Sequence, residues 1–383
     1  MAIIGLEISI LLFAAFLGYF LSVRIGQSAV IGEIIIGVLI GPSVFGLITY
    51  SDLVSILAQM GAIFLLFAIG LECKFKEIYN AKNAFIAFFG VVVPFILGFL
   101  MTRAFGYTNM ESVFVGTALT ATSIAITANV LKDMGKLNTH TAKIIIGAAV
   151  VDDILGLLVL SVSLGMGTGN FNLLDVFIKI TIAILFLAGT VIIMPYINRV
   201  MNYVGKWARK TKHIQLPLIL SISVAFAYST ISELVGLSAI VGAFLAGVTL
   251  EGLFIESYKE GTKYLEIVFS AIFFVSLGVL VNLKEIGGVS WFFVGLFIVA
   301  IISKIIGCFI PALLTGERFW NSLIIGVGMI PRGEFVMVVA LYGLTHNIIG
   351  QGIYASILLM ALLTTIIFPI ILKTLYSNAE RFK

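Results

Sequence analysis

The feature that most constrains this chain is a series of long apolar runs that follow one another from residue 3 to residue 376. A helix needs about 20 mainly apolar residues to cross a bilayer, and these runs have that length. Hydrophobic residues make up 61% of the 383 residues and charged residues only 11%, whereas roughly a quarter of a soluble domain is charged. Strands of a membrane barrel would instead give alternating segments of about ten residues. The sequence therefore predicts an all-α polytopic membrane protein.

Thirteen segments of spanning length can be marked. They lie at about 3–23, 29–48, 53–71, 83–105, 112–131, 141–166, 173–198, 214–234, 236–252, 263–283, 290–315, 320–344 and 352–376. The first run is long enough to span and lacks a basic leader, so a cleavable signal peptide is not expected.

Basic residues indicate the orientation, because Lys and Arg gather in cytoplasmic loops. With the N-terminus outside, the inner loops and the C-terminal tail hold most of the 23 basic residues, and the outer loops hold only Arg103 and Lys284. Lys179, Lys304 and Arg332 remain at membrane depth. We therefore expect a multi-pass protein of the cell membrane with its N-terminus out and its C-terminus in. The net charge of +4 follows from this loop bias and indicates no nucleic-acid partner.

An internal repeat relates the two halves. Residues 31–41 resemble residues 237–247, and residues 62–78 resemble residues 271–286. The copies are seven segments apart, and an odd offset means that they enter the membrane from opposite sides, as in secondary transporters. We predict two inverted six-helix repeats, at about 1–168 and 212–383, joined by a linker helix at about 173–198.

Two segments in matching places of the repeats contain helix-breaking patterns. Segment 320–344 contains Pro331 between glycines and can hardly stay helical there. Segment 112–131 is dense in hydroxyl and β-branched residues, although its composition also permits a helix. If both break and cross, half-helix ends and freed carbonyls meet near the midplane, where cations can be coordinated.

Two adjacent carboxylates, Asp152 and Asp153, lie in the middle of segment 141–166. One charge at the bilayer centre costs at least ~2.5–3.5 kcal/mol on insertion scales, so the pair indicates an ion or proton site. Neighbouring residues of a helix point about 100° apart, so the two carboxylates face different partners. Lys304, equally central in its own segment, is the candidate partner of one of them.

Each of these residues also has a structural interpretation. Asp152 and Lys304 could form an ion pair that only ties two helices together, which would leave Asp153 unexplained. Arg332 and Glu334 flank the broken stretch and could compensate the half-helix ends. Thr122 and Ser123 could be cation ligands or hydrogen bonders between helices.

Four motifs together resemble the monovalent cation:proton antiporter 2 family, especially its sodium/proton exchangers. They are Ala-Thr-Ser-Ile-Ala-Ile-Thr at 121–127, Val-Val-Asp-Asp at 150–153, Lys304, and Arg-Gly-Glu at 332–334. They occur in the family's order and spacing, and the similarity covers essentially the whole chain.

The resemblance implies a homodimer of thirteen-helix protomers that works as an elevator. Its ion-translocating core would be the helices at about 83–166 and 290–376, and the remaining helices would dimerise. It implies that Asp153 is the main carrier of cation and proton, and that Asp152 is a second carboxylate, paired with Lys304 when sodium is absent. Thr122 and Ser123 would line the sodium site, and Arg332 and Glu334 would tune its charges. Asp152, where electroneutral members carry Asn, implies electrogenic exchange of two protons per sodium.

Other functions stay open at this stage. A potassium/proton exchanger would have the same architecture, and a sodium-coupled organic-anion symporter also uses inverted repeats with crossed helices. An intramembrane hydrolase fits less well, because adjacent aspartates on one helix point apart. No P-loop or Gly-rich dinucleotide motif is present, so we expect neither an enzyme nor a cofactor, with a monovalent cation and the proton as substrates.

Overall fold

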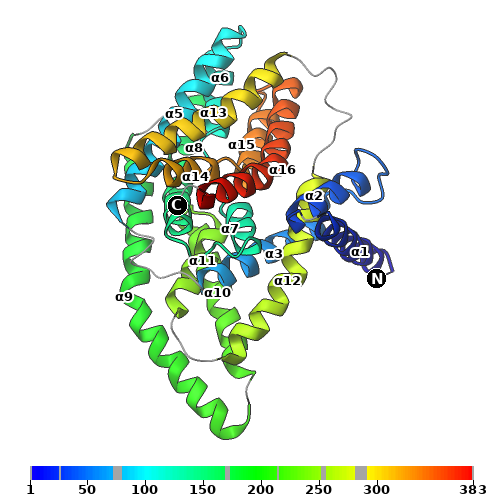
Figure 1. Cartoon of the computed structure of the whole chain (residues 1–383), viewed down its shortest axis with the longest axis vertical. Coiled ribbons are helices and arrows are strands. Elements are labelled where there is room, and N and C mark those ends of the chain that lie inside the picture. Colours follow the sequence, from blue (N-terminus) through cyan, green and yellow to red (C-terminus); the bar gives the residue numbers. More distant parts are fainter. Residues whose placement is uncertain are drawn as a thin grey trace. The chain divides into compact units, whose positions relative to one another are not determined.

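The computed structural model describes residues 2–25, 27–71, 80–168, 173–213, 215–251, 256–280 and 291–381, and its regular structure there is helical (Figure 1). The helices are α1 (Ala2–Arg24), α2 (Ala29–Ile40), α3 (Asp52–Gly70), α5 (Ala81–Ala104), α6 (Asn109–Ala118), α7 (Ile124–Asp133), α8 (His140–Thr168), α9 (Leu173–Thr211), α10 (Leu216–Leu234), α11 (Ala239–Leu250), α12 (Glu256–Val279), α13 (Trp291–Leu314), α14 (Phe319–Gly328), α15 (Glu334–Thr345) and α16 (Gln351–Arg381).

The helices follow the predicted segments, each of which corresponds to one helix or to a pair of half-helices. Eight helices in the described ranges are long and apolar enough to cross a membrane: α1, α3, α5, α9, α10, α12, α13 and α16. The chain is therefore a multi-pass membrane protein. Thirteen crossings and the orientation of the termini stay predictions.

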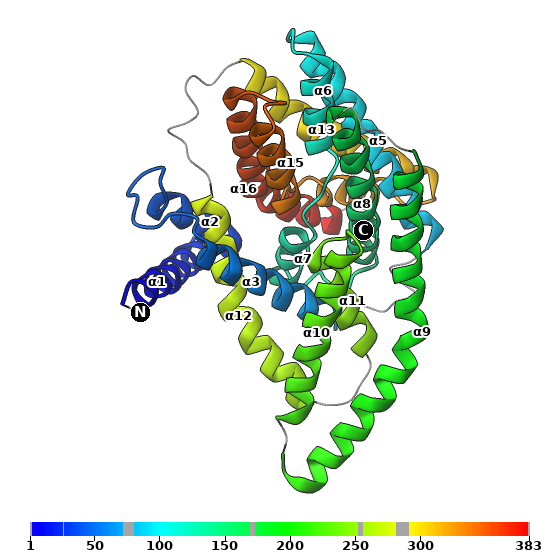
Figure 2. The ribbon, with the colours of Figure 1, turned by 180° about the vertical axis from the view of Figure 1, so that it is seen from behind.

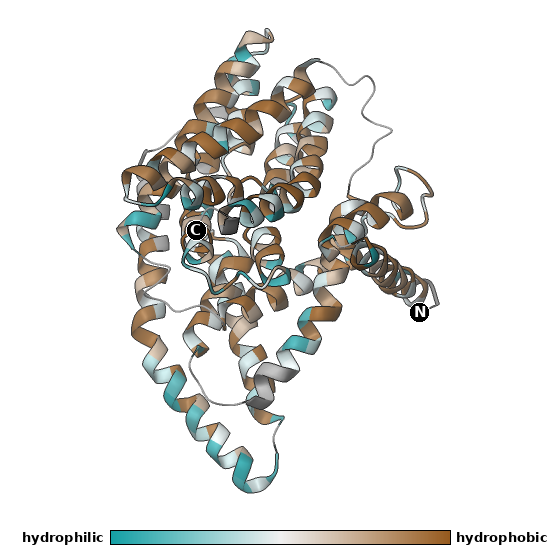
Figure 3. Ribbon diagram, in the orientation of Figure 1, coloured by the Kyte–Doolittle hydropathy of each residue, from teal (hydrophilic) through white to brown (hydrophobic). Residues whose placement is uncertain are grey.

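The boundaries that differ most from the sequence prediction are the ends of α2 and α9. Helix α2 ends at Ile40 instead of residue 48, because Gly41 is followed by Pro42, and the residue before a proline is disfavoured in the helical region. Helix α9 continues to Thr211, past the expected end at 198. Figure 3 shows that this extension is largely hydrophilic, so hydropathy marked only the apolar part of the helix.

The chain divides into two compact units. The first comprises residues 1–51, 78–172 and 274–383, and the second comprises residues 52–77 and 173–273. In the first unit, α13 packs along α5 (Figure 2). The half-helices α6 and α7 lie beside α8, and the half-helices α14 and α15 lie beside α16. All the predicted site residues belong to the first unit.

Close glycine contacts recur in the two units. A Cβ on Gly37 of α2 would lie 2.1 Å from the Val275 carbonyl oxygen, and a Cβ on Gly247 of α11 would lie 2.3 Å from the Phe67 carbonyl oxygen. In each unit a glycine lets its helix lie directly against a neighbouring backbone. The similarity of residues 31–41 to residues 237–247 stays a prediction. The repeat's parts at 72–78 and 281–286 lie outside the described residues, and its inverted topology stays a prediction.

An ionic cluster around Glu317 ties together the ends of three helices in the first unit. Glu317, between α13 and α14, accepts hydrogen bonds from Lys82, from His140 Nε2 at 2.9 Å and from Asn321 at 3.2 Å. Its partial burial opposes ionisation, but these donated hydrogen bonds outweigh that effect and hold the pKa of Glu317 below its ordinary value. The cluster thus stabilises the folded protein only while Glu317 is ionised.

Replacing Glu317 by Gln should therefore lower the melting temperature at neutral pH by a few degrees. A carboxylate with a depressed folded pKa contributes its stability above its unfolded pKa of about 4.3 and loses it as pH falls through the folded value. The difference between wild type and variant should vanish in acid when thermal unfolding in detergent is followed against pH. Glu233→Gln, at an exposed carboxylate of α10, is the matched control; a difference for Glu317→Gln that persists in acid contradicts this account.

Candidate functional site

The two broken helices meet at their breaks. Residues 119–123 separate α6 from α7, and residues 329–333 separate α14 from α15. The Ser123 amide donates to the Pro331 carbonyl at 2.8 Å, and the Thr122 hydroxyl donates to the Met329 carbonyl at 3.1 Å. A Cβ on Gly333 would lie 2.6 Å from the Ser123 hydroxyl oxygen. Both predicted breaks are thus present, and they contact each other.

Local sequence explains where the half-helices begin. Pro331 lacks an amide hydrogen and cannot continue α14. Ser123 has an extended backbone and caps α7, because its hydroxyl accepts from the Ile126 amide at 3.4 Å. The break also receives support from α7 itself, since the Thr127 hydroxyl donates to the Gly328 carbonyl at 2.9 Å.

Lys304 of α13 is fully buried beside this junction. Its ammonium lies 2.8 Å from Asp152 Oδ1 and 2.8 Å from the Gly90 carbonyl oxygen, and it also donates to the Thr120 carbonyl oxygen in the first break. An ammonium has three donors, so all three are used. The contact between Asp152 and Lys304 predicted from the sequence is therefore present.

The two aspartates of α8 are both buried, with exposed fractions of 0% for Asp152 and 8% for Asp153. Asp152 faces Lys304. The Thr122 hydroxyl and the positive charge of Arg332 also interact with the Asp152 carboxyl group. Asp153, the next residue of the helix, points about 100° away from Asp152. The junction thus brings together the Asp152 carboxylate, the Lys304 ammonium and the Thr122 hydroxyl.

Arg332 lies in the second break, 1% exposed. Its guanidinium donates to the carbonyl oxygens of Ala121, in the first break, and of Ala300, at 3.2 Å, in α13. The contact with Ala121 matches the interpretation in which Arg332 compensates the freed carbonyls of a half-helix end. Glu334 is the first residue of α15, and its side chain lies outside the described part.

Sequence reasoning missed the residues that hold Lys304 through the backbone. Gly90 of α5 provides both a carbonyl and space, since a Cβ there would lie 2.8 Å from Cys308 Sγ and 3.9 Å from the Lys304 ammonium. A single glycine among 38 carries no signal of its own, and a carbonyl oxygen is present at every residue.

The arrangement is suited to reversible binding of a hard cation. Carboxylate, hydroxyl and carbonyl oxygens are the ligands that such cations take. Lys304 already supplies a positive charge to Asp152, so a cation that bound this carboxylate would compete with the ammonium. A multi-pass helical protein with an ion pair buried where two broken helices meet has the architecture of a secondary transporter.

Comparison with known proteins identifies the family. Residues 11–377 match the family described as "Sodium/hydrogen exchanger, transmembrane", so the chain belongs to that family. It is 33% identical to the Na(+)/H(+)-K(+) antiporter GerN of Bacillus cereus, over 98% of this chain and 97% of GerN. It is also 33% identical to a Na(+)/H(+) antiporter of Enterococcus hirae, over 97% of this chain and 98% of the relative.

A solved structure shares the fold. The sodium proton antiporter MjNhaP1 of Methanocaldococcus jannaschii superposes with a TM-score of 0.70 over 100% of this chain and 98% of its own, at 16% identity. The relatives are named as transporters and not as enzymes, and the family expected from the motifs is thereby confirmed.

Proposed function

We propose that this protein is a secondary active Na⁺(Li⁺)/H⁺ antiporter in which Asp152 and Asp153 bind cation and protons in competition. The observation that carries the proposal is the fully buried contact between Lys304 and Asp152 at the junction of the two broken helices. A structural ion pair would need no second buried carboxylate beside it, whereas an exchanger uses one. The names of the relatives support the same reaction.

Competition alone couples the two ions. Asp153 takes the cation or a proton, with Thr122 and Ser123 as further oxygen ligands. Asp152 accepts either Lys304 or the incoming cation, and the released Lys304 ammonium gives its charge to the carbonyls of Gly90 and Thr120. A site stripped of both ions would carry uncompensated charge at the midplane, which is costly, so an empty carrier crosses poorly. Arg332 keeps the two breaks together through these states.

The wider mechanism follows the family resemblance. The core helices at about 83–166 and 290–376 would move as an elevator against the remaining helices, which form a homodimer. The concentration of Lys and Arg in one set of loops supports an N-terminus outside and a C-terminus inside. Two ionisable carboxylates support two protons per sodium and hence electrogenic exchange.

Potassium is a second candidate substrate, because the name of GerN includes potassium beside sodium. The same oxygen ligands would serve either ion, and the difference lies in the size of the site that they form.

The test is an exchange assay on the purified wild type in proteoliposomes. The vesicle interior is more acidic than the outside, and an entrapped dye reports its pH. We expect Na⁺ and Li⁺ to collapse the gradient, and K⁺ to do so only weakly. With the membrane potential clamped by valinomycin, exchange should depend on the potential, because one net charge moves per cycle, worth ~2.3 kcal/mol per 100 mV. Absence of proton movement with every cation refutes the antiporter, and equal responses at all potentials refute its electrogenicity.

A further inference from the structure

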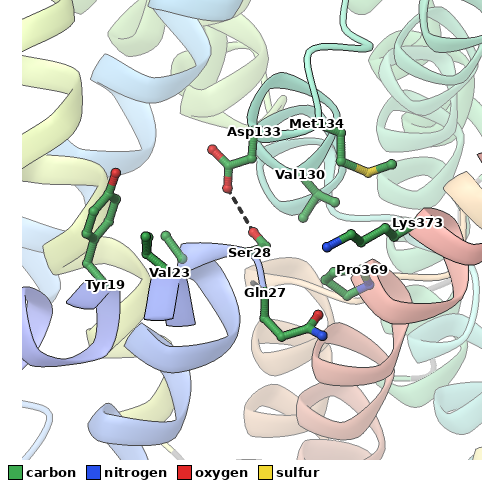
Figure 4. Close-up of a pocket in the computed structure, with 10 residues that line it drawn as sticks. Tyr19, Val23, Gln27, Ser28, Val130, Asp133, Met134, Pro369 and Lys373 are labelled. Carbon is green, nitrogen blue, oxygen red and sulfur yellow. Dashed lines mark hydrogen bonds between the residues drawn. The ribbon is translucent and has the colours of Figure 1, made fainter. Parts of the chain in front are cut away.

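A polar cavity of about 280 Å³ opens at the end of α7 that lies away from the junction of the broken helices (Figure 4). Its polar lining comprises Tyr19, Gln27, Ser28, Asp133 and Lys373. In the orientation predicted from the basic residues this is the inner end, so water comes within the length of α7, about 15 Å, of the junction. On the other side of the junction α6 packs against α8. The contact between these two helices therefore bears on how an ion reaches the outer face.

Two buried hydroxyl groups meet in the contact between α6 and α8. Thr117, near the end of α6, is 0% exposed, and Ser163 of α8 is 1% exposed. The two hydroxyl oxygens, called here the hydroxyl pair, lie 2.7 Å apart. The Thr117 hydroxyl also lies 2.8 Å from the Val113 carbonyl oxygen of its own helix. In the same way, the Ser163 hydroxyl lies 2.8 Å from the Val159 carbonyl oxygen. Four oxygen atoms from two helices thus converge at this contact.

The four oxygens make one contact more than their hydrogens can fill. A hydroxyl carries a single hydrogen, so the pair has two hydrogens for three contacts. If both hydroxyls donate to their own helix, two lone pairs face each other across the 2.7 Å contact. A cation between the two hydroxyl oxygens removes this conflict, because it binds a lone pair of each while both hydrogens stay on the carbonyls. Hydroxyl oxygens are among the ligands that hard cations take.

The hydroxyl pair lies on the face of α8 that carries Asp152. Ser163 follows Asp152 by three helical turns to within about 20°, which places it about 16 Å further along the axis. Gly156 lies between them on this face and adds no side chain. A Cβ at Gly156 would lie 3.6 Å from the Thr120 hydroxyl oxygen, an ordinary contact distance, so the space of a methyl group is open there. The face of α8 between the central site and the hydroxyl pair is therefore not filled at this position.

Thr120 links the hydroxyl pair to the central site. Its hydroxyl donates to the Thr117 carbonyl oxygen at 2.7 Å. Its own carbonyl oxygen accepts from the Lys304 ammonium, which contacts Asp152. A series of buried polar contacts thus leads from Asp152 to Ser163. The proposed exchange at Asp152 and Asp153 makes no use of the two hydroxyls at the far end of this series.

We propose that Thr117 and Ser163 form a relay site, at which the transported alkali cation binds in passage between the central site and the outer face. This inference rests on the proposed function, because it gives the hydroxyl pair a place on the cation's path. A small separation of α6 from α8 admits the cation, and the Val113 and Val159 carbonyls keep the hydroxyl hydrogens while it is bound. A hydrogen bond that only ties two membrane helices together would need neither access from water nor any response to sodium.

Labelling of the variant Ser163→Cys tests whether the hydroxyl pair lies on the path. In a background with Cys73→Ser and Cys308→Ala, a membrane-impermeant cationic thiol reagent is added to the outer face of right-side-out vesicles. We expect it to modify the added cysteine, and Na⁺ to slow the reaction several-fold. Thr102→Cys on α5 is the matched control, because Thr102 is equally buried and its hydroxyl also donates to the carbonyl four residues earlier. No reaction at position 163, equal reaction at both positions, or a rate that ignores Na⁺ would overturn the proposal.

Uptake of ²²Na⁺ into the same vesicles gives a second readout. Thr117→Val keeps the shape of the side chain but removes the hydroxyl, so kcat/KM for uptake from the outer face should fall about tenfold, the loss expected for one partner of a charge. Thr117→Ser keeps the hydroxyl and should stay within about twofold of wild type, as should the control Thr102→Val. Wild-type uptake by Thr117→Val, or an equal loss in Thr117→Ser, refutes the relay site. A wild type that exchanges no protons for cations refutes the exchange function alone, because the labelling and its response to Na⁺ still decide the relay site.

Discussion

Replacing Asp153 by Asn is expected to reduce cation-driven proton movement to the level of protein-free vesicles. Asn has nearly the same shape, so it fits the buried position on α8, but it neither takes up a proton nor carries the charge that holds a cation. The assay is the proteoliposome pH-dye experiment with Na⁺, Li⁺ and K⁺ added in turn. Thermal unfolding in detergent should show a protein close to wild type in stability, which separates loss of chemistry from loss of fold.

Two further variants make this result specific. Asp52→Asn, the same chemical change at an exposed residue that begins α3, should keep wild-type exchange and lose at most about 1 kcal/mol of helix stabilisation. Asp153→Glu keeps the carboxylate but moves it by one methylene, so we expect partial exchange with an altered ranking of cations. Wild-type exchange by the Asp153→Asn variant would remove Asp153 from the carrier role.

The contact between Asp152 and Lys304 could be predicted from the sequence because charge is costly in an apolar segment. Both residues stand out in their segments, and Lys304 is equally central and would otherwise be a buried ammonium without a counter-charge. The break at Pro331 could be predicted equally well, because a proline between glycines disfavours a helix. The order of the four motifs along the chain then sufficed to identify the family.

What the sequence left open depended on contacts between distant residues. Residues 117–127 could have formed a helix, and the break there is fixed by hydrogen bonds of Thr122 and Thr127 to carbonyls about 200 residues away. No local pattern encodes such bonds.

Lys304→Met is expected to cause the largest loss of stability. Breaking a buried ion pair by removal of one partner typically costs 3–5 kcal/mol, because the other charge stays buried without compensation. Here the change also removes the donor that the Gly90 and Thr120 carbonyls share. Thermal or denaturant unfolding in detergent measures the loss. Lys263→Met, at an exposed lysine of α12, should stay within about 0.5 kcal/mol of wild type.

The double variant Lys304→Met with Asp152→Asn decides whether the uncompensated charge of Asp152 causes the loss of stability. If the cost of Lys304→Met comes from the uncompensated Asp152 carboxylate, neutralising Asp152 should recover most of it, and the cycle of single and double variants should give a clear coupling energy. Two independent losses that simply add would mean that Lys304 acts mainly through the two carbonyls. The Asp152–Lys304 pair would then only hold two helices together, and the argument for cation competition at Asp152 would lose its support.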